Sequence, residues 1–173
     1  MLKQCLFCVI LSEKTLKGVA IMEELTIRTI TDENWRAIVE LKANPEQANF
    51  ISPNAESMLE AFYETKFNWT TYGLYIENLP VGFAMIGAYN EEHQYIWLDR
   101  FMIDAQSQGK GYGKRFLEKL IAFIRQNWSV KDIVLSINEE NLAAKRLYET
   151  FNFKNTGRID EENGERIMVL SER

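Results

Sequence analysis

A glycine-rich turn is the part of the sequence whose residue spacing points most directly to chemistry. It reads Gln108-Gly109-Lys110-Gly111-Tyr112-Gly113-Lys114 and stands between an expected strand and an expected helix. Glycines let the backbone curl tightly, so that successive N–H groups at the start of a helix point into one space. Such a nest binds a diphosphate or a similar anion, and Lys110, Lys114 and Arg115 add positive charge. The turn therefore predicts an anion-binding site.

Two common phosphate-binding motifs do not fit this turn. A Walker loop requires GxxxxGK[ST], but Gln108 stands at the first glycine position and Arg115 follows Lys114. The dinucleotide motif GxGxxG requires a glycine where the chain has Lys114. The pattern that the turn does satisfy is Gln/Arg-x-x-Gly-x-Gly/Ala, through Gln108, Gly111 and Gly113.

A second pattern follows the next expected strand and reads Asn141-x-x-Ala144-x-x-Leu147-Tyr148-x-x-x-Asn152-Phe153. Together, and in this order, the two patterns resemble the GNAT superfamily of acetyl-CoA-dependent N-acetyltransferases, over Leu25 to Leu170. That family usually has glycine where this chain has Asn152. Asparagine is the non-glycine residue that most readily adopts the left-handed conformation needed at a helix C-terminus, so the substitution leaves the resemblance intact.

The resemblance implies a binding site for acetyl-CoA as co-substrate, without a metal ion. The glycine-rich turn is expected to hold the coenzyme diphosphate. The backbone of Phe101, Met102 and Ile103 is expected to pair with the pantetheine arm, while their side chains are core. The full set of expected coenzyme-binding residues is Phe101, Met102, Ile103, Gln108, Gly109, Lys110, Gly111, Tyr112, Gly113, Lys114, Asn141, Ala144 and Tyr148.

Tyr148 and Asp99 are the expected catalytic residues. Tyr148 resembles the family tyrosine near the coenzyme sulfur, and a phenol with a pKa of about 10 can donate a proton to the leaving thiolate. Asp99 is expected to accept the amine proton, because the family often carries a carboxylate on this strand. A core tyrosine is the alternative for Tyr148, and a structural ion pair or a water acting as the base is the alternative for Asp99. His93 lies in the polar stretch Glu91-Glu92-His93 and is expected to be a solvated loop residue.

The stretches Val81–Met85 and Trp97–Phe101 are most similar to the bacterial spermidine/spermine acetyltransferases, which makes a polyamine the expected small-molecule substrate. An acidic cleft would attract such a polycation. Glu46, Glu56, Glu60 and Tyr63, with Asp99, are the side chains that could line this cleft, or they could form a solvated helix face. The alternatives are another amine (a protein N-terminus, an amino acid or an aminoglycoside) and a non-catalytic acyl-CoA sensor.

The hydrophobic pattern predicts the elements that position these residues. We expect strands at Leu25–Ile30, Tyr72–Ile76, Val81–Ala88, Tyr95–Ile103, Asp132–Ile137, Phe153–Ile159 and Arg166–Leu170, and a polar loop at 44–53. Helices are expected around Trp35–Leu41, Asn54–Phe67, Phe116–Arg125 and Asn141–Thr150. The second helix has Met58, Leu59, Phe62 and Tyr63 as its apolar stripe. This order predicts an α/β fold, a three-layer α/β sandwich around a central mixed, mostly antiparallel sheet.

Composition excludes several other classes of protein. The chain has 173 residues, 46% of them hydrophobic, which suits one globular domain. Its formal charge of −5 disfavours a nucleic-acid binder, which needs a broad basic face. No apolar run approaches the roughly 20 residues that span a bilayer, so we expect no membrane association and a cytoplasmic location. Cys5 and Cys8, with His93 as the only histidine, are too few for a zinc site of about four ligands.

Residues 1–21 differ from the rest and are expected to lie outside the fold. They hold both cysteines and a short apolar run, while Met22 opens a charged stretch that leads into the first strand. We hypothesise that Met22 is the true start and that 22–173 form a single N-acetyltransferase domain. Without Lys3, Lys14, Lys17 and Glu13 the formal charge would be −7 instead of −5. The resemblance also implies a homodimer, a state common in the family.

Overall fold

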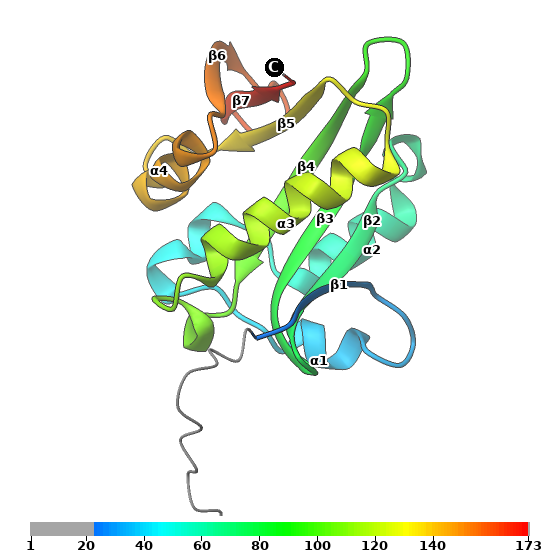
Figure 1. Ribbon diagram of the computed structural model, residues 1–173, viewed down its shortest axis with the longest axis vertical. Coiled ribbons are helices and arrows are strands. Elements are labelled where there is room, and N and C mark those ends of the chain that lie inside the picture. The colour runs from blue at the N-terminus through cyan, green and yellow to red at the C-terminus, as the bar shows by residue number, and fades with distance from the viewer. Residues whose placement is uncertain (1–22, 173) are drawn as a thin grey trace, which may run out of the picture.

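The computed structural model describes residues 23–172, in which seven strands form one sheet in the order β1-β2-β3-β4-β5-β7-β6 (Figure 1). The strands are β1 (Leu25–Thr29), β2 (Thr70–Ile76), β3 (Leu79–Asn90), β4 (Tyr95–Ile103), β5 (Asp132–Ile137), β6 (Lys154–Ile159) and β7 (Arg166–Ser171). Neighbouring strands are antiparallel except β4 and β5, which are parallel. The mixed, mostly antiparallel sheet expected from the sequence is confirmed.

Helices cover both faces of the sheet. They are α1 (Trp35–Val39), α2 (Asn54–Tyr63), α3 (Tyr112–Asn127) and α4 (Leu142–Thr150), with short 3-10 helices η1 (Pro45–Phe50), η2 (Thr65–Phe67) and η3 (Ala105–Ser107). The helices α1 and α2 pack on one face, and α3 and α4 on the other (Figure 1). The three-layer sandwich is therefore confirmed, and the loop expected at 44–53 contains η1.

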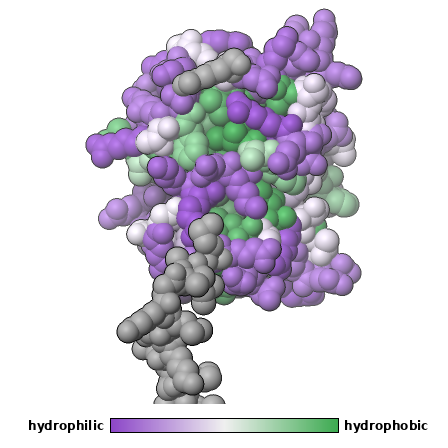
Figure 2. All heavy atoms as spheres, in the orientation of Figure 1, coloured by the Kyte–Doolittle hydropathy of each residue, from purple (hydrophilic) through white to green (hydrophobic). Residues whose placement is uncertain are grey.

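An apolar core closes each face. The larger core contains the α3 side chains Phe116, Leu117, Leu120, Ile121 and Ile124, together with Tyr148 and Phe153. The smaller core packs Ile38 of α1 against β2, β3 and β4. Figure 2 shows that hydrophilic residues cover most of the face on which α3 lies, as an amphipathic helix requires.

The parallel strands β4 and β5 pair only at their beginnings. Their register joins Tyr95 to Asp132, Ile96 to Ile133 and Trp97 to Val134, and stops there. The outer edge of β4 stays paired with β3 as far as Ile103, and that of β5 stays paired with β7 along its whole length. The two strands therefore separate inside an otherwise continuous sheet.

A β-bulge accompanies this separation. Met85 of β3 pairs with Arg100 and the next residue, Ile86, pairs with Leu98, so Asp99 is the extra residue on β4. A bulge leaves one residue without a cross-strand partner and bends its strand. The bulge thus bends β4 at the position of the expected catalytic carboxylate.

The apolar stripe predicted for the second helix is largely wrong. The helix α2 ends at Tyr63, and Leu59, Phe62 and Tyr63 are 59%, 73% and 74% exposed. Its buried residues are instead Asn54 and Ser57. The Asn54 Nδ2 atom donates to the Ile38 carbonyl oxygen at 2.8 Å, which lets a polar residue lie in the contact with α1.

The hypothesis about residues 1–21 falls outside the described part of the chain. Among residues 23–172 no helix has both the length and the apolar character needed to cross a bilayer.

The second residue after α4, Asn152, tests the expected backbone conformation. Asn152 has a φ of 66°, the left-handed value expected from the sequence. We expect Asn152→Ala to lower the free energy of unfolding by about 1 kcal/mol, because alanine is strained at this φ. Asn152→Gly is expected to be neutral or slightly stabilising. Urea denaturation compares the two variants, and an alanine variant as stable as the glycine variant would contradict the prediction.

Candidate active site

A cavity of about 690 Å³ lies where β4 and β5 separate. Residues 99–103 of β4 form one wall, and Ser136 and Ile137 of β5 form the other. The glycine-rich turn, α4, residues 47–53 and the connection before β7, through Asn163 and Glu165, add to the lining. The structure thus brings the two sequence motifs and the β4 segment into one space.

The glycine-rich turn has the backbone that a nest for anions requires. Gly109 and Gly111 have φ values of 76° and 79°, which L side chains rarely adopt. Gly111 is the N-cap of α3, and no side chain caps this helix end among the described residues. The first N–H groups of α3 are therefore available to an anion.

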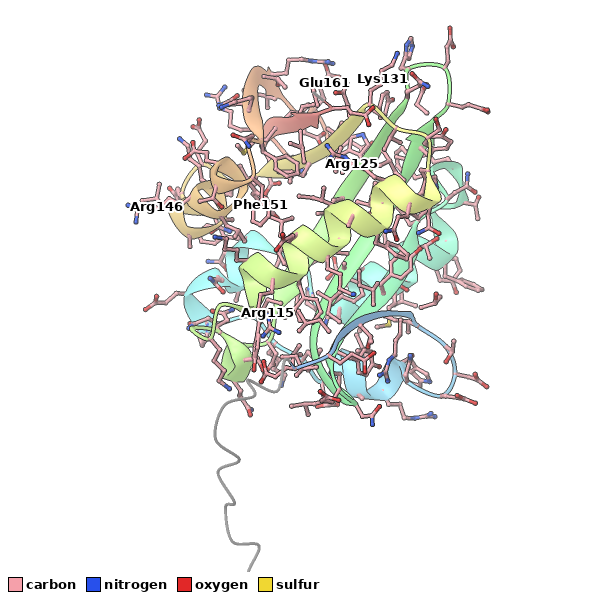
Figure 3. All side chains as sticks on the ribbon, viewed as in Figure 1. Arg115, Arg125, Lys131, Arg146, Phe151 and Glu161 are labelled. Carbon is pink, nitrogen blue, oxygen red and sulfur yellow. The ribbon has the colours of Figure 1, made fainter. Side chains whose placement is uncertain are left out.

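The positive charge expected beside the turn is partly engaged by other groups. Lys114 lines the cavity, but the Lys110 Nζ atom donates to the Gln106 carbonyl oxygen at 3.0 Å. Arg115, at the start of α3 (Figure 3), pairs with the Glu23 carboxylate at 2.7 Å. The same carboxylate accepts a hydrogen bond from the Tyr112 hydroxyl at 3.0 Å.

These two hydrogen bonds hold the pKa of the Glu23 carboxyl below its usual value, and the bond from Arg115 has the larger effect. The pair with Arg115 is exposed, and exposed ion pairs contribute little to stability. A phosphate group can therefore replace Glu23 on Arg115 at little cost.

The side chain of Gln108 is engaged by neighbouring groups of the chain. Its Nε2 atom donates to the Ile103 carbonyl oxygen at 2.9 Å and to the Gln47 Oε1 atom at 2.8 Å. These bonds fasten the end of β4 to the turn and to η1. Gln108 lines the cavity, and its side chain positions the surrounding backbone.

Asn141 is likewise a positioning residue in this structure. Its Oδ1 atom accepts the Ala144 backbone N–H at 3.1 Å and so caps the N-terminus of α4. Both residues line the cavity. The cap sets the direction in which α4 presents Tyr148.

Tyr148 lies on α4, buried to 7% exposure, and lines the cavity. Its ring makes an edge-to-face contact with Phe153, at a centroid distance of 5.5 Å. Burial, and secondarily the negative charge of Glu165, raise the pKa of its phenol above the ordinary value. Tyr148 is therefore a neutral hydrogen-bond donor throughout the physiological range.

Asp99 projects from the bulge into the same cavity. Its Oδ2 atom is in contact with the Arg100 Nη1 atom, and the Arg100 Nη2 atom lies 3.1 Å from the Glu60 Oε2 atom. Burial raises the pKa of Asp99 to about 6, against the opposing effect of Arg100. The ion pair considered from the sequence is thus present, on a carboxylate that also faces the cavity.

The acidic residues at the cavity differ from those expected. Glu46, Glu56 and Tyr63 are exposed and do not line it, and Glu60 reaches it only through Arg100. The second carboxylate in the lining is Glu165, just before β7. Sequence reasoning missed Glu165 because no motif includes it. It also missed residues 47–53, which looked like an ordinary polar loop.

Two further expectations were that His93 is a solvated loop residue and that the site holds no metal ion. His93 is exposed on the connection between β3 and β4, with its ring stacked beside Tyr95 at 6.5 Å. In residues 23–172 no three or more histidine, cysteine, aspartate or glutamate side chains form a group that could hold a metal ion.

Comparison with known proteins gives a family match over most of the chain. A sequence profile described as "Acetyltransferase (GNAT) family" matches residues 31–153. The spermine/spermidine N(1)-acetyltransferase of Bacillus subtilis strain 168 is 40% identical over 150 residues, covering 84% of this chain and 97% of that relative.

Solved structures share the fold. The spermidine N-acetyltransferase of Vibrio cholerae, in complex with CoA and spermine, aligns with a TM-score of 0.66 at 18% identity, covering 84% of this chain and 92% of that one. The aminoglycoside acetyltransferase AAC(6')-Ib, in complex with paromomycin and acetyl-CoA, aligns with a TM-score of 0.71 at 20% identity, covering 86% and 94%. At these identities the likeness concerns the fold.

The raised pKa of Asp99 predicts how stability depends on pH. Because the folded protein binds this proton more tightly than the unfolded chain, ionised Asp99 destabilises the fold. The penalty grows as the pH rises from about 4 to 6 and is constant above that. We expect Asp99→Asn to raise the free energy of unfolding at pH 8 by up to about 3 kcal/mol, and to have little effect at pH 4.

Urea denaturation at both pH values measures this difference, with Asp32→Asn at an exposed position as the control. A loss of stability at pH 8 in Asp99→Asn would show that the contact with Arg100 outweighs the burial of the charge.

Proposed function

Because the chain belongs to the acetyltransferase (GNAT) family, we propose that it transfers an acetyl group from acetyl-CoA to a primary amine of a polyamine such as spermidine or spermine. The observation that carries the choice of substrate is the 40% identity to a spermine/spermidine acetyltransferase over nearly its whole length. The carboxylates of Asp99 and Glu165 in the cavity lining support a polyamine as the substrate, since a polyamine carries several positive charges.

The chain's own groups provide the donor site. The N-terminus of α3 and Lys114 bind the coenzyme diphosphate, with Gly109 and Gly111 shaping the backbone. The β5-facing edge of residues 98–103 has no strand partner and offers backbone groups to the amides of the pantetheine arm. Asp99 and Tyr148 line the same cavity, in which acetyl-CoA would supply the acetyl group.

Asp99 receives the proton that the amine must lose before it attacks. An alkylammonium has a pKa of about 10.4, so its deprotonation near neutral pH costs about 4 kcal/mol. With a pKa of about 6, Asp99 is ionised at pH 7.5 and can accept a proton. Because this pKa lies close to the working pH, Asp99 can also release the proton again readily. A water between Asp99 and the amine is consistent with the same role.

Tyr148 stabilises the thiolate that leaves. Since its pKa is raised, the phenol donates a hydrogen bond to the sulfur more readily than it gives up its proton. The ammonium loses two protons on becoming an amide. Asp99 takes the first and releases it to solvent, and the second ends on the coenzyme thiol as the C–N bond forms and the C–S bond breaks, so the reaction balances without a metal or a redox partner.

The expected homodimer and cytoplasmic location stay predictions. An enzyme for another amine and a non-catalytic acyl-CoA sensor are the alternatives that experiment must separate from the proposed function.

Release of free thiol from acetyl-CoA measures the reaction directly. We expect kcat/KM for spermidine or spermine to exceed that for lysine, an N-terminal peptide and kanamycin by at least about tenfold, a difference of about 1.4 kcal/mol in transition-state binding. Equal activity with lysine or a peptide would contradict the polyamine assignment. Thermal stabilisation by acetyl-CoA without turnover of any amine would identify a sensor.

Replacing Tyr148 by phenylalanine tests the role of its hydroxyl. We expect Tyr148→Phe to lower kcat by about 10- to 100-fold, because a hydrogen bond to the developing thiolate is lost. The KM for acetyl-CoA should stay within about twofold, since the ring still packs on Phe153. Tyr72→Phe, in the core on the α3 side, is the matched control. An unchanged kcat in Tyr148→Phe would remove the hydroxyl from the mechanism.

A further inference from the structure

The cavity has two carboxylates in its lining, and they differ in their partners. Asp99 is in contact with the guanidinium of Arg100, which also bridges to Glu60. Glu165 forms no ion pair with a cationic side chain among residues 23–172. Within residues 23–172, Asp99 therefore has a positively charged partner and Glu165 does not.

Glu165 is nevertheless held firmly in place. Its Oε2 atom accepts a hydrogen bond from the Ser136 hydroxyl at 2.7 Å, and Ser136 also lines the cavity. Its backbone N–H donates to the Asn163 Oδ1 atom at 2.9 Å, and its carbonyl oxygen accepts the Asp160 N–H at 2.8 Å. A neutral hydroxyl thus orients the carboxylate, and two further hydrogen bonds hold the backbone of Glu165.

Such an arrangement favours a positive ligand. A half-buried carboxylate loses part of its hydration, and one neutral hydrogen bond replaces only a fraction of it. A substrate ammonium supplies both the missing charge and further hydrogen bonds. Glu165 and Tyr148 line the same cavity, and the charge of Glu165 acts on the Tyr148 phenol.

We propose that Glu165, oriented by Ser136, binds an ammonium group of the substrate and selects amines that carry more than one positive charge. The proposal rests on the proposed function and names the residue that gives its site this preference. Asp99 serves the amine that reacts, and Glu165 serves a second ammonium of the same molecule. Glu165 lies beyond residues 31–153, the part of the chain that matches the family profile.

Glu165→Gln is the direct test, because glutamine keeps the size of the side chain and removes its charge. Glu161→Gln is the matched control: Glu161 (Figure 3) lies on the same β6–β7 connection, is exposed and does not line the cavity. Both variants lose one negative charge, so long-range attraction of the polycation changes equally. The measurements are KM and kcat for spermidine and for hexylamine, which has one charge, together with the KM for acetyl-CoA.

We expect Glu165→Gln to raise the KM for spermidine about tenfold or more and to change the KM for hexylamine less than threefold. Glu161→Gln should leave both KM values within about twofold of wild type. The KM for acetyl-CoA should stay within about twofold in both variants, which also shows that the fold is intact. Ser136→Ala should raise the KM for spermidine by a smaller factor, since the charge remains and only its orientation is lost.

Equal KM values for spermidine in Glu165→Gln and Glu161→Gln would overturn the proposal, as would an equal rise for hexylamine. Failure of the proposed function gives a different result, because the wild-type protein would then leave spermidine unacetylated. In that case the comparison is made with the amine that the wild type does acetylate, and an unchanged KM in Glu165→Gln again overturns the role of Glu165.

Discussion

The separation of β4 from β5 is the constraint on which the rest of the structure depends. Each strand keeps its outer partner, so the sheet stays intact while a row of backbone groups loses its partner on the inner side. Unpaired backbone groups away from water are costly, and a ligand with its own amides can satisfy them. The core under α3 and the bulge at Asp99 keep the strands apart, so the gap is part of the folded state.

The cavity in this gap has two ends of opposite character. At one end, the N-terminus of α3 and Lys114 offer partial and full positive charge. At the other end, Asp99 and Glu165 face the cavity, and Glu60 lies just behind Arg100. A chain with net negative charge can thus bind an anionic cofactor and a cationic substrate side by side, because the attraction that matters is local. Tyr148 lines the same cavity.

Local sequence predicted the features that depend on local physics. The β4 and β5 boundaries follow from apolar runs, the turn from its glycines, and the left-handed Asn152 from a helix end. Features that depend on contacts between distant segments were missed or misjudged. The apolar residues of α2 suggested a buried stripe, but Leu59, Phe62 and Tyr63 are exposed, and the hydrogen-bonded amide of Asn54 lies in the contact with α1. The position of Glu165 at the cavity and the ion pair between Glu23 and Arg115 both depend on segments that are far apart in the sequence.

The central claim is that the coenzyme occupies the gap between β4 and β5. Amide hydrogen exchange with and without coenzyme A tests it most directly, because exchange reports which backbone N–H groups gain partners. The structure predicts slower exchange, by about tenfold or more, at residues 98–103 and 109–114, with β1 and β2 unchanged. Protection confined to other elements, with both of these segments exchanging as in the free protein, would contradict the account.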